Sequence, residues 1–206
     1  GDGNGGAPAA ATGDDKNVSL AMIANGMNIV EDLVPQIVRT YQARLNDRPL
    51  RDLHQMADRV EELYDELIHR YCTLRAEWIF SKKLLWPSTT YDEAECAATV
   101  PSKKFHGFFV YLHRLSQALA SSVAPEAVVL VVGDVLDQVL ARMLDCDEFW
   151  QQRFSRWGVQ RLVADVRFIA AAAGAYATTT VAAYLAAISD RAVAQYVRDA
   201  NVDVPA

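Results

Sequence analysis

The stretch that decides the fold is "LHQMADRVEELYDELIHRYCTLRAEW", residues 53–78. Charged side chains occupy most of the positions between its regularly spaced apolar ones. The apolar set recurs every three or four residues and consists of Leu53, Met56, Val60, Leu63, Leu67, Tyr71, Leu74 and Trp78. This spacing predicts an amphipathic helix of about 35 residues, ~50 Å long at 1.5 Å per residue. A helix of that length indicates an elongated domain.

Helical spacing continues on both sides of this stretch. Residues 18–45 repeat the pattern, and Pro35 is expected to kink or divide that helix. Residues 86–101, which contain Pro87 and Pro101, are predicted to form a loop. Further helices are predicted over residues 103–121, 125–143, 159–173, 180–188 and 191–197. The predicted fold class is therefore all-α, an elongated stacked helical bundle of roughly six or seven helices.

One apolar run admits a second interpretation. Val128–Val132, followed by Gly133 and Asp134, could form a buried parallel strand of a nucleotide-binding α/β fold. Pro125 opens the segment as it would open a helix, and the apolar spacing continues past the glycine, beyond the length of a typical strand. The helix is favoured, with Gly133 costing about 1 kcal/mol of helix stability.

The domain organisation follows from composition. Residues 1–17 are rich in Gly, Ala and Asp, without the pattern of a signal peptide, and are predicted to be a flexible lead-in. Residues 18–206 form the helical-bundle domain, which can divide into two stacked sub-bundles with a junction near 147–158. Alanine is the commonest residue of the uncharged segment 168–189 and adds little insertion energy, so a transmembrane span is disfavoured. Gly174 and the following threonines instead indicate a break between helices, with a threonine capping the second.

Charge and cysteine usage restrict the partners and the compartment. The formal net charge is -6, which lacks the basic footprint that nucleic-acid binding requires. The three cysteines are widely spaced and contain no CxxC pair. They are expected to be small core residues in a reducing compartment.

The sequence lacks the common catalytic and metal-binding patterns. No HExxH motif, no pair of histidines four residues apart and no G-x-S-x-G elbow occurs. Glu66 and His69 form one Glu-x-x-His pair, whereas a di-metal carboxylate bundle needs two on facing helices. No catalytic residue, cofactor or metal is therefore predicted, and the acidic residues 61–66 are expected to form a solvated face.

Two lysine pairs flank the predicted loop. Lys82, Lys83, Lys103 and Lys104 could form one basic patch and contact anionic lipid at ~1 kcal/mol per lysine. The acidic residues between the two pairs favour ordinary solvated lysines instead.

The segment "FWQQRFSRWGVQRLVADVRFI", residues 149–169, carries a family resemblance. An FW pair, a polar spacer and a Gly-apolar-Gln helix resemble the end of exocyst component eight, the eighty-four-type exocyst subunit, in its C-terminal helical domain. Arg161 departs from that family's usual second glutamine. The matching residues are Phe149, Trp150, Gly158, Val159, Gln160, Leu162, Asp165 and Phe168.

A second match lies near the start of the chain. Residues 20–38 are similar to that family's Ala, Asn and Leu segment running into Leu-Leu-Pro, with Ile23, Ala24, Asn25, Leu33, Val34 and Pro35 in the matching places. The resemblance spans residues 18–190. Residues 47–148 match by pattern only, and the alanine-rich segment after Ala170 departs from the family composition.

The resemblance implies a helical rod of the kind found in multisubunit vesicle tethers. It implies a non-enzymatic protein of exocytosis, cytoplasmic and peripheral at the plasma membrane and secretory vesicles. The implied partners are other exocyst subunits, with SNARE proteins as a further class. Two alternatives stay open: a sibling tether of Golgi or endoplasmic-reticulum traffic, and a membrane-surface adaptor using the lysine patch. A helical enzyme or ligand-binding bundle is a third class.

The tryptophans of the FW segment suggest a structural junction. Trp150 and Trp157 are expected to clamp two bundle layers, since each aromatic side chain can bury ~150–250 Å². Gly158 would let the next helix start close to its neighbour, and Leu162 would pack behind it. Gln160 and Asp165 are expected to be surface or cap partners.

Overall fold

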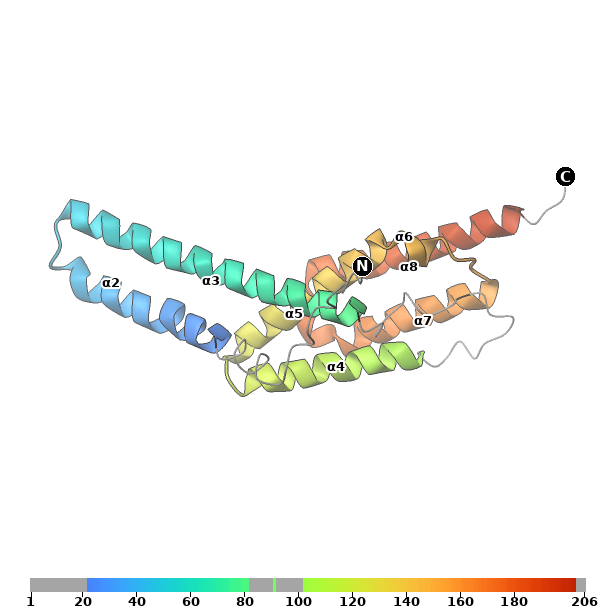
Figure 1. The fold of residues 1–206 in the computed structure, drawn as a ribbon, viewed down its shortest axis with the longest axis horizontal. Coiled ribbons are helices and arrows are strands. Elements are labelled where there is room, and N and C mark those ends of the chain that lie inside the picture. The colour runs from blue at the N-terminus through green and yellow to red at the C-terminus, as the bar shows by residue number, and fades with distance from the viewer. Residues whose placement is uncertain (1–21, 82–90, 92–101, 203–206) are drawn as a thin grey trace, which may run out of the picture. The chain divides into compact units, whose positions relative to one another are not determined.

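The computed structural model describes residues 22–81, 91 and 102–202. These residues are helical apart from short connections, and no strand occurs among them, so the predicted all-α class is confirmed (Figure 1). The chain divides into two compact units, Gly1–Tyr71 with Ser121–Val123, and Cys72–Ala120 with Ala124–Ala206. The segment 147–158 lies inside the second unit, and the predicted lead-in of residues 1–17 lies outside the described residues.

The first helix of the first unit contains a π-helical turn just before Pro35. Residues 22–28 are α-helical, Ile29–Leu33 form the π-helical turn η1, and α2 runs over Val34–Gln42. The Val34 N–H donates to the Ile29 carbonyl five residues back. Proline has no N–H to continue an α-helical ladder, and the wider turn accommodates it within the helix. The chain stays helical through Pro35, so the helix is not divided there and instead contains a π-helical turn just before the proline.

Helix α3, Asp47–Ser81, is 35 residues long, as the apolar spacing predicted. It follows α2 after a short turn in which the Tyr41 carbonyl accepts the N–H groups of Arg44 at 2.9 Å and Leu45 at 3.0 Å. The two helices run antiparallel, because Gly26 near the start of the first lies against Tyr64 far along α3. A Cβ at Gly26 would lie 2.7 Å from the Tyr64 ring. The first unit is therefore a helical hairpin.

The second unit is a four-helix bundle with additional short elements (Figure 1). Its long helices are α4 (Lys103–Ala120), α5 (Pro125–Asp145), α7 (Arg156–Ala172) and α8 (Thr179–Val202), with α6 (Asp147–Trp150) and η3 (Gly174–Tyr176) between them. Helices α5 and α7 each contact both α4 and α8. Residues 72–81 of α3 add a buried layer, in which Trp78 stacks on Tyr111 of α4 at 5.1 Å between ring centroids.

Helix α5 forms where the strand alternative was considered, so the helix interpretation is correct. Gly133 also has a packing role that the sequence did not indicate. A Cβ there would lie 3.1 Å from the Tyr176 carbonyl oxygen and 3.4 Å from Thr178 Cγ2. The missing side chain lets the backbone of η3 lie directly against α5.

The end of the chain contains one helix where two were predicted. Helix α8 continues through Ser189 and Asp190, which were expected to separate two helices. The Ser189 hydroxyl donates to the Leu185 carbonyl at 3.1 Å, so the serine is satisfied inside the helix. The predicted threonine cap is confirmed, since Thr178 Oγ1 accepts the Val181 N–H at 3.0 Å.

Candidate functional site

The FW pair lies in a buried aromatic cluster of the second unit. Phe149 and Trp150 on α6 are joined by Phe154 from the connector between α6 and α7, and by Tyr91. Trp150 stacks on Phe154 with ring centroids 5.9 Å apart, and Phe154 stacks on Tyr91 at 5.8 Å. Phe149 meets the other three rings edge-on. All four side chains are almost fully buried, so the cluster is core.

Trp150 is fixed by polar contacts as well as by packing. Its indole Nε1–H donates to the Met143 carbonyl at 2.9 Å, near the end of α5. The guanidinium of Arg191, on α8, lies over the indole ring at 4.6 Å and donates to the Leu144 carbonyl. Trp150 therefore joins α5, α6 and α8.

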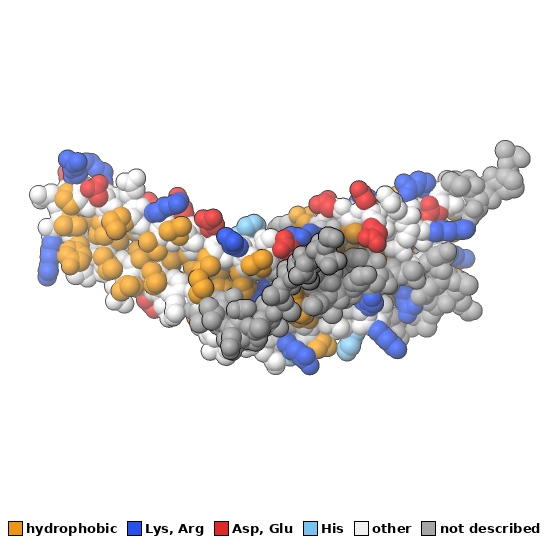
Figure 2. Space-filling model, viewed as in Figure 1, with side chains coloured by type: hydrophobic (Ala, Val, Ile, Leu, Met, Phe, Trp, Pro, Cys, Tyr) orange, Lys and Arg blue, Asp and Glu red, His pale blue; other side chains and the backbone are white. Residues whose placement is uncertain are grey.

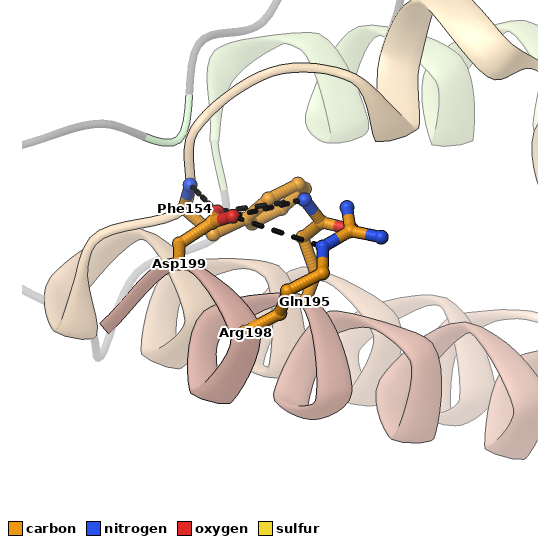
Figure 3. Close-up of polar contacts among 4 residues, drawn as sticks. All are labelled: Phe154, Gln195, Arg198 and Asp199. Carbon is orange, nitrogen blue, oxygen red and sulfur yellow. Dashed lines mark hydrogen bonds and ion pairs between the residues drawn. The ribbon is translucent and has the colours of Figure 1, made fainter. Parts of the chain in front are cut away.

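The polar connector between α6 and α7 is bound to α8 through one carboxylate (Figure 3). Asp199 Oδ2 accepts the Phe154 N–H at 3.1 Å, and Gln195 donates to the same carboxylate at 3.3 Å. Arg198 donates to the Gln195 amide oxygen, so the three α8 side chains form one network. The network thereby holds Phe154 in its place within the aromatic cluster.

Gly158 lies in the first turn of α7 and provides a close backbone contact. Ser155 caps that helix by accepting the Gly158 N–H at 3.0 Å. A Cβ on Gly158 would lie 1.6 Å from the Tyr91 carbonyl oxygen. Glycine is thus required at this position by the backbone of Tyr91, and not by a neighbouring helix as the sequence suggested.

Asp165 was expected to be a surface or cap partner; it is fully buried, so the surface alternative is wrong. It accepts the Tyr91 hydroxyl at 3.1 Å and, through its other oxygen, the Ser102 N–H at 2.6 Å, just before α4. Burial raises the pKa of its carboxyl, and these hydrogen bonds and the nearby Arg161 partly offset that rise. Asp165 occupies a core position of α7, three residues after the buried Leu162. An acid at an apolar helix position was the signal that could have identified it.

The remaining predicted junction residues differ in burial. Leu162 is fully buried in the core face of α7, whereas Trp157 is only half-buried in the same helix. Gln160 is exposed, as expected. The structure places Trp150, Gly158 and Leu162 in well-packed surroundings and leaves Trp157 at the edge of them.

A groove of about 440 Å³ borders the cluster and mixes both charge signs. Asp147 and Trp150 line one wall, and Arg191 and Arg198 come from α8. Arg191 is engaged by the Leu144 carbonyl and the indole ring, and Arg198 by its α8 neighbours. The groove suits contact with a polar protein surface better than capture of a small anion.

Two of the four lysines of the predicted basic patch lie among the described residues. Lys103 is exposed and Lys104 half-buried in the first turn of α4, while Lys82 and Lys83 lie outside the described residues. Two cations in a first helical turn oppose the helix dipole there.

The described part of the chain offers no group of three or more His, Cys, Asp or Glu side chains that could hold a metal ion. Cys72 is buried and donates weakly to the Val131 carbonyl at 3.6 Å, and burial raises the pKa of its thiol. Cys146 is half-buried at the end of α5, and Cys96 lies outside the described residues. Cys72 is a core residue, as predicted.

The hairpin of the first unit leaves apolar side chains uncovered. Figure 2 shows hydrophobic side chains gathered over α2 and α3. Six of them, a third or more exposed, define what we call the hairpin face: Ile29, Leu33, Ile37, Tyr41, Met56 and Leu63. The long helix carries two apolar positions per turn, more than one neighbouring helix can cover. That excess of apolar positions is visible in the sequence.

Helix geometry places these residues on one side of the hairpin. Val34, Val38 and Ala57 line an open groove of about 280 Å³ between the helices, and Leu33, Ile37 and Met56 each precede one of them by one position. In an antiparallel pair, the same offset on both helices points to the same side. The opposite border of the groove is charged, with Arg39 and Glu61 one position after Val38 and Val60.

No helix in the described part of the chain is long and apolar enough to cross a membrane. No family model matches the chain, and neither the curated proteins nor the solved structures contain a match to it.

Proposed function

We propose that this chain is a non-enzymatic helical domain of an exocyst-type vesicle tethering complex that acts in exocytosis through protein–protein contacts. The exocyst assignment rests on the two sequence matches, around Leu33-Val34-Pro35 and around the FW segment. The all-α architecture agrees with it. On this proposal the protein is cytoplasmic and peripheral at the plasma membrane and secretory vesicles, with other exocyst subunits and SNARE proteins as partners.

The observation that carries the protein-binding part of the proposal is the hairpin face. Leu33, Met56 and Leu63 are each half or more exposed. Contiguous exposed apolar surface of this kind is typical of a protein-interaction site. In the second unit, by contrast, the aromatic cluster and Asp165 are buried. The Asp165 carboxylate is bound by Tyr91 and Ser102 of the same unit.

Affinity purification of the tagged chain from its own cells tests the proposal. We expect other exocyst subunits to co-purify in amounts above those with an unrelated helical protein of equal charge. Recovery of Golgi or endoplasmic-reticulum tether subunits instead would move the chain to a sibling complex. Recovery of no tethering subunit would refute the proposal. The elongated shape is tested separately by solution scattering, which should report a rod.

A membrane-surface adaptor is the second candidate, because Lys103 is exposed in a helical turn that does not favour cations. Flotation with vesicles of neutral and anionic lipid tests it. We expect charge reversal of Lys82, Lys83, Lys103 and Lys104 to abolish flotation if this candidate is correct. Charge reversal of Arg48 and Arg51, exposed in α3, is the matched control. Equal flotation of both variants would remove the adaptor.

A further inference from the structure

A partly enclosed pocket of about 150 Å³ lies in the second unit, between α4 and the turn that leads from α7 into η3. Its lining is mainly apolar and aromatic, with Phe109, Leu112 and His113 from α4 and Ala173, Ala175 and Tyr176 from the turn. Leu112 and Ala173 are almost fully buried and close its floor. No Asp, Glu, Lys or Arg is among the described residues that line it, so an uncharged ligand is favoured.

The alanines at the end of α7 leave this space open. Residues 170–173 and 175 are all alanine, which has no side-chain atom beyond Cβ. The space does not collapse, because η3 is held on two sides. The Tyr176 hydroxyl donates to the Ser116 hydroxyl of α4 at 2.9 Å, and the backbone of η3 lies against α5 at Gly133. The pocket is therefore already formed in the folded bundle.

The size and the walls of the pocket indicate what fits it. An apolar cavity of this volume can hold benzene, whereas a drug-sized ligand needs about 300 Å³ or more. Phe109 and Tyr176 present ring surfaces, against which another ring packs edge-on or offset. The Phe109 ring is itself supported from two sides, edge-on by Phe168 at 5.8 Å and in parallel by His113 at 6.4 Å between ring centroids.

We propose that this pocket binds one uncharged aromatic ring of about the size of benzene. Two sources present such a ring, a free small molecule and a phenylalanine side chain of a partner protein. The inference does not rest on the tether proposal, because the purified chain binds the ring without any other subunit.

Titration of the purified chain with benzene, followed by two-dimensional NMR of its methyl groups, tests the proposal. We expect saturable shifts of the Leu112 and Ala173 methyl signals, because a bound ring alters the magnetic field at the methyl groups beside it. Ala175→Leu should abolish these shifts, because the longer side chain occupies the pocket. Ala175 is exposed, so the variant should keep its helical circular dichroism. The matched control is Ala171→Leu, exposed in the last turn of α7 and outside the pocket, which should leave the shifts unchanged.

Two further probes define the ligand. Cyclohexane has a similar size without an aromatic ring and should bind more weakly than benzene, so equal or tighter binding of cyclohexane would overturn the aromatic class. Binding of N-acetylphenylalanine amide with the same shifts would assign the ring to a partner side chain, and binding of benzene alone would assign it to a free small molecule. Absence of saturable shifts with benzene, or shifts that Ala175→Leu leaves intact, would overturn the proposal.

Discussion

Replacing Gly158 with alanine should destabilise the second unit strongly, although alanine is the better helix former. The new Cβ would lie 1.6 Å from the Tyr91 carbonyl oxygen and 2.5 Å from its carbonyl carbon. These are backbone atoms, so no side-chain rotation can relieve the overlap. The Tyr91 peptide must move by about 2 Å, the difference between 1.6 Å and an ordinary contact distance of ~3.5 Å.

The size of the effect follows from what holds Tyr91 in place. Its carbonyl accepts the Ser155 N–H at 3.0 Å, its N–H donates to Gln152 at 3.0 Å, and its hydroxyl donates to Asp165. Each hydrogen bond contributes about 0.5–1.5 kcal/mol. Its ring is fully buried, and complete expulsion of such a ring costs about 3–5 kcal/mol. Alanine returns about 1 kcal/mol of helix propensity. We therefore expect a net loss of about 2–4 kcal/mol.

Urea unfolding followed by far-ultraviolet circular dichroism measures this loss. Gly107→Ala is the matched control, because Gly107 lies inside α4 with no atom within 4 Å of the added Cβ. It should gain up to about 1 kcal/mol from helix propensity. Gly133→Ala, whose Cβ would lie 3.1 Å from the Tyr176 carbonyl oxygen, should fall between the two. If Gly158→Ala is as stable as the parent, or if Gly107→Ala loses as much, the close-contact reasoning is wrong.

Three other predictions concern the residues around this contact and the buried thiol. Asp165 has a raised pKa, so the folded protein binds its proton more tightly than the unfolded chain, and its contribution to stability should fall as pH rises above 3.8. Asp165→Asn can keep both contacts, because the Tyr91 hydroxyl can accept from the new amide as well as donate. Urea titrations should then show that the free energy of unfolding falls less steeply with pH than in the parent. Parallel pH profiles of the two proteins would contradict this. Trp150→Ala should lower the free energy of unfolding by about 3–5 kcal/mol. Trp157→Ala should lower it by distinctly less, because the Trp157 ring is only half-buried. Equal losses in urea unfolding would be evidence against this difference in burial. Cys72 should react with a thiol reagent only on unfolding while Cys146 reacts in the native protein, as peptide mass mapping can determine; rapid native labelling of Cys72 would argue against its burial.

Helix positions were predictable from the sequence where one periodic pattern extends over many residues. The 35-residue helix α3 and the continuation of α5 past Gly133 are of this kind, because a period of 3.6 is a local property. The predicted break at Ser189–Asp190 was wrong for a local reason as well. Polar residues suggest an end, yet the Ser189 hydroxyl finds a carbonyl partner within the helix.

The tertiary contacts of the candidate site were not predictable in the same way. The Asp165 carboxylate binds Ser102, which is 63 positions away in the sequence, and Tyr91, which is 74 positions away. No local pattern encodes that pairing. Gly158 was recognised as unusual, but its reason is the backbone of Tyr91, which comes from a different part of the chain. Exposure of Leu63 and Met56 depends on how many helices surround α3, which the spacing of their own helix cannot specify.

The double attachment at Asp165 has a consequence for protein engineering. One carboxylate binds Tyr91 through its hydroxyl and Ser102 through its N–H, so both ends of the intervening segment are anchored at a single point. A label attached at Asp165 would therefore disturb both contacts at once, whereas Gln160 is exposed on the same helix and offers an attachment point that leaves them intact.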